Sequence, residues 1–271
     1  MKGKFEQLFD LNLLVFNIVG KIKTADRYVR KHYMFSVIKR NKVLENLPEN
    51  KSKKCYIIGL GPSLKSVNLD KIGGDTIVLN RFFKVGEQYP SFIPTYYMLS
   101  DEQFVNKDNI NDFELCLKAY SNKGTKYLLD SRFSRNPLLK QFDNENFYFI
   151  SGPSGIINVK KHYSMTKPTP VFFNTVGGAI FLAICMGYKH IVLLGCDFSS
   201  FATPMPQHCY DEHKDEKLRS LSMELFCYSF AAKAHELLRK YAINNGARIV
   251  NSTKGSLIDA YPIEIDENLY K

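Results

Sequence analysis

Two strand-and-turn signatures, one near each end of the chain, constrain its fold more than any other feature. In the first, a short apolar run ends in the sequence GLGPS at residues 59–63. In the second, residues 174–188 place two adjacent glycines in an apolar helical pattern, and the apolar strand pattern that follows ends at Asp197. Both are typical of a parallel α/β sheet, in which glycines and polar side chains at the strand ends contact nucleotides.

Short apolar runs alternate with helical patterns along most of the chain. We expect strands at residues 55–59, 76–80, 95–100, 125–129, 147–150, 190–195 and 248–251. We expect helices at residues 101–120, 175–186 and 215–245. Because the strands are separated by crossover segments, the sequence predicts an α/β fold: a Rossmann-like, mostly parallel sheet in one domain over residues 54–271.

Residues 1–53 are expected to form a basic, amphipathic helical arm. Lys and Arg outnumber Asp and Glu by 13 to 5 over residues 1–54, which accounts for most of the net charge of +10. This excess favours a nucleotide phosphate or an anionic lipid as partner, and the nearly neutral remainder argues against a nucleic-acid groove. Residues 5–20 are too short and too polar to span a membrane. The arm therefore either lies on an anionic membrane surface or packs on the body or on a second subunit.

Six scattered cysteines, without a C-x-x-C pair or a secretory signal, favour a reduced, cytoplasmic compartment. A membrane-bound arm would then place the protein on the inner face of the cytoplasmic membrane.

Residues 198–216 contain two prolines and little periodicity, and such long connections are often lids over a site. The side chains of this predicted lid that can take part in catalysis are His208, Tyr210 and His213. An imidazole there can take a proton from a hydroxyl near neutral pH. For each histidine, a surface position without a catalytic role is an equally good interpretation.

The candidate nucleotide-binding residues share one property: each lies where a predicted strand ends or a predicted helix begins. They are Gly59, Gly61, Pro62, Ser63, Asn80, Ser100, Asp101, Asn174, Thr175 and Asp197. Ser63, Asp101 and Thr175 also fit simple helix N-caps. Asn80 also fits a turn, and Asp197 a structural carboxylate. The convergence of these positions on one sheet edge favours a ligand site.

Two absences narrow the chemistry of that site. The first turn lacks the third glycine of the dinucleotide fingerprint, and Asn80 stands where an acidic ribose ligand would close the next strand, so an NAD enzyme is disfavoured. No Asp-x-Asp pair stands out as a Mg²⁺ ligand set for a sugar diphosphate. We therefore expect no metal ligands and no cofactor.

At these residues the chain resembles the bacterial sialyltransferases of glycosyltransferase family 42, and also a related domain of motility-accessory proteins that modify flagellin. The resemblance runs from about residue 54 to residue 255 and is sharpest at the two glycine signatures. It implies a single GT-A-like domain with a lid, a CMP-sugar donor, no metal, and a lid histidine as base in an inverting transfer. Gly61, Ser63, Asn80 and Thr175 match the family's nucleotide contacts.

The chain departs from the family pattern at two places. Ser199 stands where the family has a phosphate-binding tyrosine, and Ser100-Asp101 replaces a second asparagine at a strand end. Tyr210 is a candidate replacement for the missing phosphate donor. His213 is preferred over His208 as the base because it lies nearer the following helix.

The sequence therefore leads to the hypothesis of a glycosyltransferase that moves a sialic acid or related sugar onto a bacterial lipooligosaccharide or capsule glycan. Two alternatives remain. One is a Mg²⁺-dependent pyrophosphokinase with carboxylates at Asp101 and Asp197, and the other is a non-catalytic, membrane-tethered scaffold. The resemblance also suggests a homo-oligomer.

Overall fold

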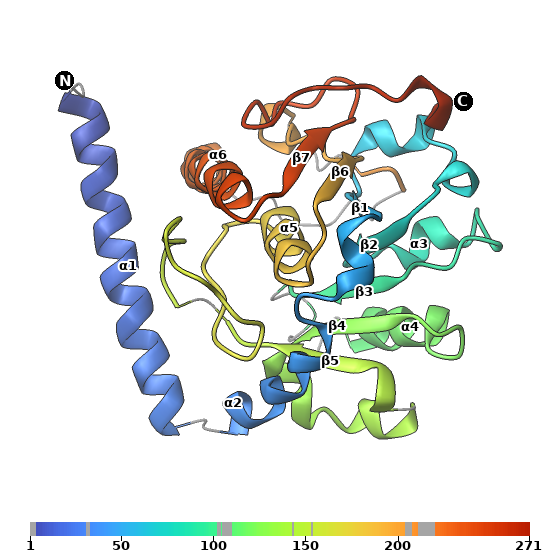
Figure 1. The fold of residues 1–271 in the computed structure, drawn as a ribbon, viewed down its shortest axis with the longest axis horizontal. Coiled ribbons are helices and arrows are strands. Elements are labelled where there is room, and N and C mark those ends of the chain that lie inside the picture. The colour runs from blue at the N-terminus through green and yellow to red at the C-terminus, as the bar shows by residue number, and fades with distance from the viewer. Residues whose placement is uncertain are drawn as a thin grey trace.

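The structure, a computed structural model, describes residues 4–30, 33–101, 104, 110–142, 144–152, 154–203, 208–210 and 220–271. Seven strands form one parallel sheet in the order β5-β4-β3-β2-β1-β6-β7 (Figure 1). They are β1 (Lys54–Ile58), β2 (Asp75–Leu79), β3 (Tyr96–Leu99), β4 (Lys126–Asp130), β5 (Phe147–Ile150), β6 (His190–Leu194) and β7 (Arg248–Asn251). All seven expected strands are confirmed, as is the Rossmann-like parallel arrangement.

The topology places a switch point beside β1. β1 pairs with β2 on one side and with β6 on the other, so the chain leaves β1 toward one sheet edge and later returns to build toward the other. In open α/β sheets, ligands bind in the crevice outside the carboxyl ends of the strands at such a point. The fold therefore directs attention to the turns that follow β1, β2 and β6.

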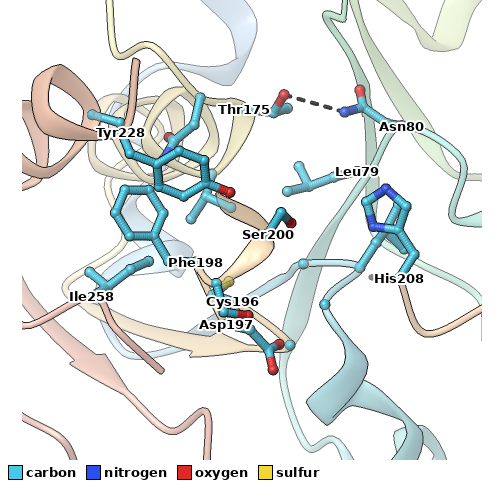
Figure 2. A pocket seen from close by; sticks show the side chains of 18 of the residues that line it. Leu79, Asn80, Thr175, Cys196, Asp197, Phe198, Ser200, His208, Tyr228 and Ile258 are labelled. Atoms are coloured by element: carbon cyan, nitrogen blue, oxygen red, sulfur yellow. Dashed lines mark hydrogen bonds between the residues drawn. The ribbon is translucent and has the colours of Figure 1, made fainter. Parts of the chain in front are cut away.

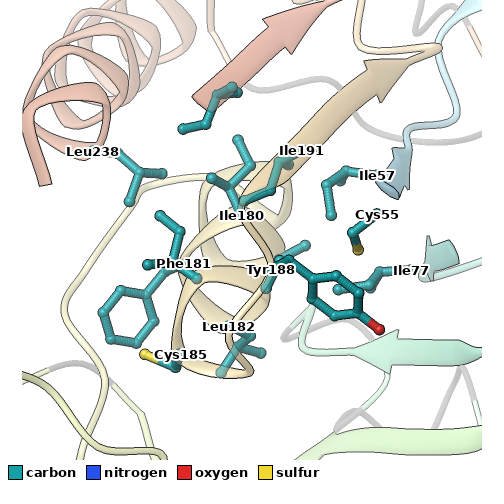
Figure 3. Packing of buried hydrophobic residues seen from close by; sticks show 14 of the residues in the cluster. Cys55, Ile57, Ile77, Ile180, Phe181, Leu182, Cys185, Tyr188, Ile191 and Leu238 are labelled. Atoms are coloured by element: carbon teal, nitrogen blue, oxygen red, sulfur yellow. The ribbon is translucent and has the colours of Figure 1, made fainter. Parts of the chain in front are cut away.

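Helices cover both faces of the sheet. They are α1 (Lys4–Arg30), α2 (Tyr33–Val37), α3 (Phe83–Gly86), α4 (Ile110–Tyr120), α5 (Thr175–Cys185) and α6 (Leu221–Asn244). One buried cluster joins α5 and α6 to the sheet, as Ile180, Ile57 and Leu238 illustrate (Figure 3). A second cluster joins α3 and α4 to the opposite face. Burial on both faces explains why the strands are almost continuously apolar rather than alternating.

The structure describes two of the expected helices over shorter ranges. α4 begins at Ile110, and Asp101 lies outside it. The described part of the last helix begins at Leu221, capped by the Ser220 side chain. The turn after β1 carries only a 3₁₀ segment, η3 (Pro62–Ser66), instead of an α-helix. A 3₁₀ turn of this length gives no substantial helix dipole, so that basis for phosphate binding at Ser63 does not hold.

α5 is held at both ends. The Asn174 side chain caps its N-terminus by accepting from the Gly177 amide at 2.7 Å. At the other end, the backbone amides of Asn46 and Leu47 donate to the Cys185 and Met186 carbonyls, both at 3.0 Å. The segment around Leu47 thus holds the C-terminus of α5 in place.

The N-terminal region has two parts. Residues from Ile38 to Leu44 form a 3₁₀ segment whose two end residues are buried, and the Asn41 side chain donates to the carbonyl oxygens of Phe149 and Met165. α1 instead lies along the side of the body (Figure 1). The division of the chain at residue 53 stays a prediction.

α1 contacts the body along one side only. Phe16 packs against Phe230 of α6 and Phe173, with ring centroids 4.8 and 5.5 Å apart. Farther along, Gly20 approaches the Gly155 backbone so closely that a Cβ on Gly20 would lie 2.9 Å from it. The exposed apolar side chains of α1 are Leu11, Leu14, Val15, Ile18, Val19 and Ile22. Within the described ranges, no helix combines the length and the apolar character that crossing a bilayer requires.

Candidate active site

A cavity of about 270 Å³ lies outside the carboxyl ends of β1, β2 and β6, at the switch point. The turns after these strands form its floor, the N-terminus of α5 forms one wall, and α6 forms another (Figure 2). Of the candidate residues from the sequence, it gathers Gly59, Gly61, Pro62, Asn80, Asn174, Thr175, Asp197 and His208.

The remaining candidates lie elsewhere. Ser63, Ser100 and Asp101 are not among the described residues that line the cavity. Tyr210 lines a second hollow on the far side of residues 208–210. His213 and most of the expected lid lie outside the described residues, which include only 198–203 and 208–210 of that segment.

The glycines of the first signature are required by a close approach of two turns. The Gly59 amide donates to the Leu194 carbonyl at 2.8 Å, and the Gly61 amide donates to Gly195 at 2.9 Å. A Cβ on Gly59 would overlap the Gly195 carbonyl oxygen, and one on Gly61 would overlap the Asp197 carboxylate. These amides are therefore already satisfied and are not free to bind a phosphate, contrary to the role expected for them.

Asp197 links the two turns. Its carboxylate accepts from the Ser63 hydroxyl at 2.6 Å and from the Ser63 backbone amide at 3.1 Å. Ser63 thus contacts a carboxylate, where the sequence predicted a nucleotide phosphate. The pair fixes the turn after β1 against the turn after β6.

Asn80 presents an unused hydrogen-bond acceptor. Its side-chain nitrogen donates to the Thr175 hydroxyl at 3.3 Å, and its backbone carbonyl accepts from the Tyr97 hydroxyl at 2.6 Å. Its Oδ1 atom is buried and has no partner within the described chain. A buried acceptor left unsatisfied costs about 1–3 kcal/mol, so its persistence at a cavity points to a ligand that donates to it.

The backbone around the cavity is held in unusual conformations. Among the described residues, four other than glycine have positive φ angles, and three of them line the cavity: Asn80 at 47°, Phe173 at 60° and Phe198 at 60°. Residues in this region cost about 1–3 kcal/mol and gather at functional sites. The cluster supports a functional role for the cavity.

A buried hydrogen-bond chain, which no sequence pattern indicated, orients the Asn174 cap. The Asn174 amide nitrogen lies 2.9 Å from His235 Nε2, and His235 Nδ1 lies 2.8 Å from the Tyr261 hydroxyl. Because an amide nitrogen only donates, Nε2 accepts and Nδ1 carries the proton. Burial lowers the pKa of His235 to about 4, so the ring is neutral at physiological pH.

The α6 wall is the other part of the site that sequence reasoning missed. Glu224, Cys227 and Tyr228 line the cavity from one face of α6. The Tyr228 ring packs 4.5 Å from the ring of Phe198, and burial raises the pKa of its hydroxyl, while hydrogen bonding to Ser200 opposes the shift. Tyr228 therefore stays protonated and can donate. The i, i+3, i+4 spacing of these polar residues on a long helix was the available signal.

His208 faces Tyr228 across the cavity (Figure 2). Its ring stacks on Tyr210 at 5.1 Å, and the intervening Cys209 amide donates to the Leu60 carbonyl at 2.8 Å. The described part of the segment is thus tied to the turn after β1. Among the described residues, no three His, Cys, Asp or Glu side chains gather closely enough to hold a metal ion.

Comparison with known proteins identifies the fold. No family model and no curated protein matches the sequence. The crystal structure of the monofunctional α-2,3-sialyltransferase Cst-I from Campylobacter jejuni is similar, with a TM-score of 0.50 and 18% identity over 81% of this chain and 82% of that chain. The sialyltransferase CstII from the same organism, in complex with cytidine-5'-monophosphate, matches with a TM-score of 0.48 and 17% identity over 82% of this chain and 88% of that chain. The resemblance expected from the glycine signatures is confirmed at the level of the fold.

Proposed function

We propose that this protein is a glycosyltransferase that transfers a sialic acid or a related acidic sugar from a CMP-sugar donor. The observation that carries the proposal is the unpartnered Asn80 Oδ1 beside Thr175 at the switch-point cavity. The fold shared with the sialyltransferase Cst-I supports the same class of reaction.

In this proposal the donor binds across the ends of β1, β2 and β6. Asn80 Oδ1 accepts a hydrogen bond from the nucleotide or the sugar. The phosphate lies at the N-terminus of α5, where Thr175 and Val176 line the cavity. Tyr228 takes the phosphate-donor role that the sequence analysis considered for Tyr210, because Tyr228 lines this cavity and Tyr210 does not.

The reaction proposed is a single displacement with inversion. The bond between the sugar's anomeric carbon and the phosphate oxygen breaks, and CMP leaves with the bonding electrons. An acceptor hydroxyl attacks from the opposite face, and a histidine takes its proton. His208 is the described histidine at the cavity, and His213 is the second candidate. No metal ion is assigned a role, and the acceptor is a bacterial surface glycan such as lipooligosaccharide or capsule.

The proposal is tested by calorimetric titration of the protein with CMP, UDP, GDP and ATP, with and without Mg²⁺. We expect CMP to bind without metal, and Asn80→Ala to weaken that binding about tenfold, the effect of losing one buried hydrogen bond with a polar ligand. Binding of ATP alone, and only with Mg²⁺, would instead indicate a pyrophosphokinase. Failure of every nucleotide to bind would leave the scaffold hypothesis.

No structural observation favours the pyrophosphokinase. It would need carboxylates at Asp101 and Asp197, yet only Asp197 lines the cavity, and its oxygens already accept from Ser63.

We further propose that α1 binds the anionic inner face of the cytoplasmic membrane, close to a lipid-linked acceptor. The apolar side chains of Leu14 and Ile18 are exposed, as are the neighbouring Lys21 and Lys23, a combination suited to the interface of an acidic bilayer. Flotation with phosphatidylglycerol vesicles should recover the protein, and Leu14→Glu/Ile18→Glu should abolish recovery. Equal recovery with neutral phosphatidylcholine vesicles would remove the electrostatic part of the proposal.

A further inference from the structure

A second hollow, with a volume of about 540 Å³, lies between η3 and α3 on the far side of residues 208–210. Its polar lining comprises Lys65, Lys84, Gln88, Tyr89 and Tyr210. The residues of η3 and α3 that form its base, Leu64 and Val85, are buried members of the core. The hollow is thus built on fixed elements of the fold.

Among the described residues that line it, the hollow carries two positive charges and no negative one. Within the described chain, neither Lys65 nor Lys84 forms an ion pair, and no carboxylate is among the described lining residues. Lys84 is half-buried, with its Nζ 4.7 Å from the centre of the Tyr210 ring. Because a cation over an aromatic face is attracted to the ring, the Lys84 ammonium group is positioned before a ligand binds. The partner that fits two such ammonium groups is an anion.

The second hollow and the switch-point cavity share their wall. His208 lines the cavity, Tyr210 lines the hollow, and their rings stack on each other. On the other side of the wall, Leu60 lines the cavity while Lys65 lines the hollow. The hollow therefore adjoins the cavity across residues 208–210.

We propose that this hollow is the acceptor subsite for an acidic sugar, one that carries a carboxylate or a phosphate group. This inference rests on the proposed function, because it assigns the hollow to the acceptor of that reaction. Lys65 and Lys84 bind the anionic group, and the Gln88 amide contacts a sugar hydroxyl. A neutral glycan leaves both ammonium groups without a partner, so the subsite selects acidic acceptors.

The test measures binding directly and does not depend on turnover. The full-length protein is titrated with α-1,4-digalacturonate, galactose 6-phosphate and neutral galactobiose, followed by ligand-observed NMR. We expect both acidic probes to bind more tightly than galactobiose. Lys65→Gln/Lys84→Gln should weaken the acidic probes at least about tenfold and leave galactobiose unaffected, as expected for the loss of charge-assisted contacts. The relative affinities of the two acidic probes distinguish a carboxylate from a phosphate as the preferred group.

Lys140→Gln is the matched control, because Lys140 is an exposed lysine of a 3₁₀ turn outside both hollows. Acidic probes that bind no better than galactobiose would overturn the subsite, as would a double variant that loses no more than the control. CMP titration of the same samples separates the two proposals. If CMP binds but the lysine substitutions do not weaken the acidic probes, the proposed subsite is wrong and the proposed function stands. If the acidic probes bind but CMP does not, the hollow binds anions but is not an acceptor site.

Discussion

The two walls of the switch-point cavity are built differently. The wall at α5 is fixed by paired hydrogen bonds: Asn174 to Gly177 and His235, and Asn80 to Thr175. The opposite side, formed by residues 208–210, contributes the stacking of His208 on Tyr210 and a backbone hydrogen bond from Cys209 to Leu60. The difference indicates that the side proposed to hold the nucleotide is preorganised by hydrogen bonds. The side proposed to receive the acceptor is less constrained in conformation.

The largest expected effect concerns catalysis at the less rigid wall. Removing the base should lower the transfer rate by about 10²–10⁴-fold, the usual contribution of a positioned general base. We expect this from His208→Ala, with His213→Ala as the parallel variant, in a transfer assay on CMP-sialic acid. Thermal melting should show that both variants remain folded. If both retain full activity, the proposed mechanism is wrong.

The next largest effect should come from the rigid side. Gly59→Ala places a Cβ against the Gly195 carbonyl oxygen, and two backbones that touch cannot both relax. We expect a loss of about 2–4 kcal/mol in the free energy of unfolding, together with weaker CMP binding. Gly73→Ala is the matched control, because its Cβ would meet no atom within 4 Å. Chemical denaturation should give a lower free energy of unfolding for Gly59→Ala than for Gly73→Ala. Equal stabilities would contradict the close approach of the two turns.

A third prediction concerns the pH dependence of the α5 wall. The folded-state pKa of His235 is about 4, below the value of about 6.5 expected for an unfolded histidine. The folded protein therefore resists protonation, and this group's contribution to stability is present above pH 6.5 and is lost as the pH falls toward 4. The slope should approach about 1.4 kcal/mol per pH unit within that window.

His235→Gln should remove most of this slope in urea denaturation series measured between pH 4 and pH 7. His162→Gln, at an exposed loop histidine, should leave it unchanged. An unchanged slope in His235→Gln would show that the ring is not held neutral by the fold.

The smallest effect distinguishes two tyrosines. Tyr228→Phe should weaken CMP binding by about three- to tenfold, which corresponds to one hydrogen bond of about 0.5–1.5 kcal/mol. Tyr210→Phe should leave CMP affinity unchanged, because Tyr210 faces the second hollow. If calorimetry shows that Tyr210→Phe weakens CMP binding and Tyr228→Phe does not, Tyr210 is the phosphate contact and the assignment of Tyr228 is wrong.

The sequence predicted one side of the site better than the other for a physical reason. Strand ends and glycine turns are local features, so Gly59, Asn80 and Thr175 could be located from apolar runs that stop at a polar residue. The contribution of Tyr228 depends on which face of α6 meets the sheet, and that is decided by packing between residues far apart in the chain. The burial of His235 is a property of the same packing.

The pairing of Ser63 with Asp197 could not be read from the sequence. Both residues lie at strand ends as expected, but whether a hydroxyl meets a phosphate or a carboxylate depends on the separation of two turns, which no local pattern encodes.

The clamping of α5 has a mechanical consequence. The helix has 11 residues and is therefore about 16 Å long. Asn174 holds one end and the segment around Leu47 holds the other, so α5 behaves as a strut that can neither slide along its axis nor rotate without breaking hydrogen bonds at both ends. Any widening or narrowing of the cavity during turnover must then come from displacement of its other boundaries, α6 and residues 208–210. Because Phe16 of α1 packs on Phe230 of α6, a load applied to α1 at a bilayer would be carried to one of these boundaries.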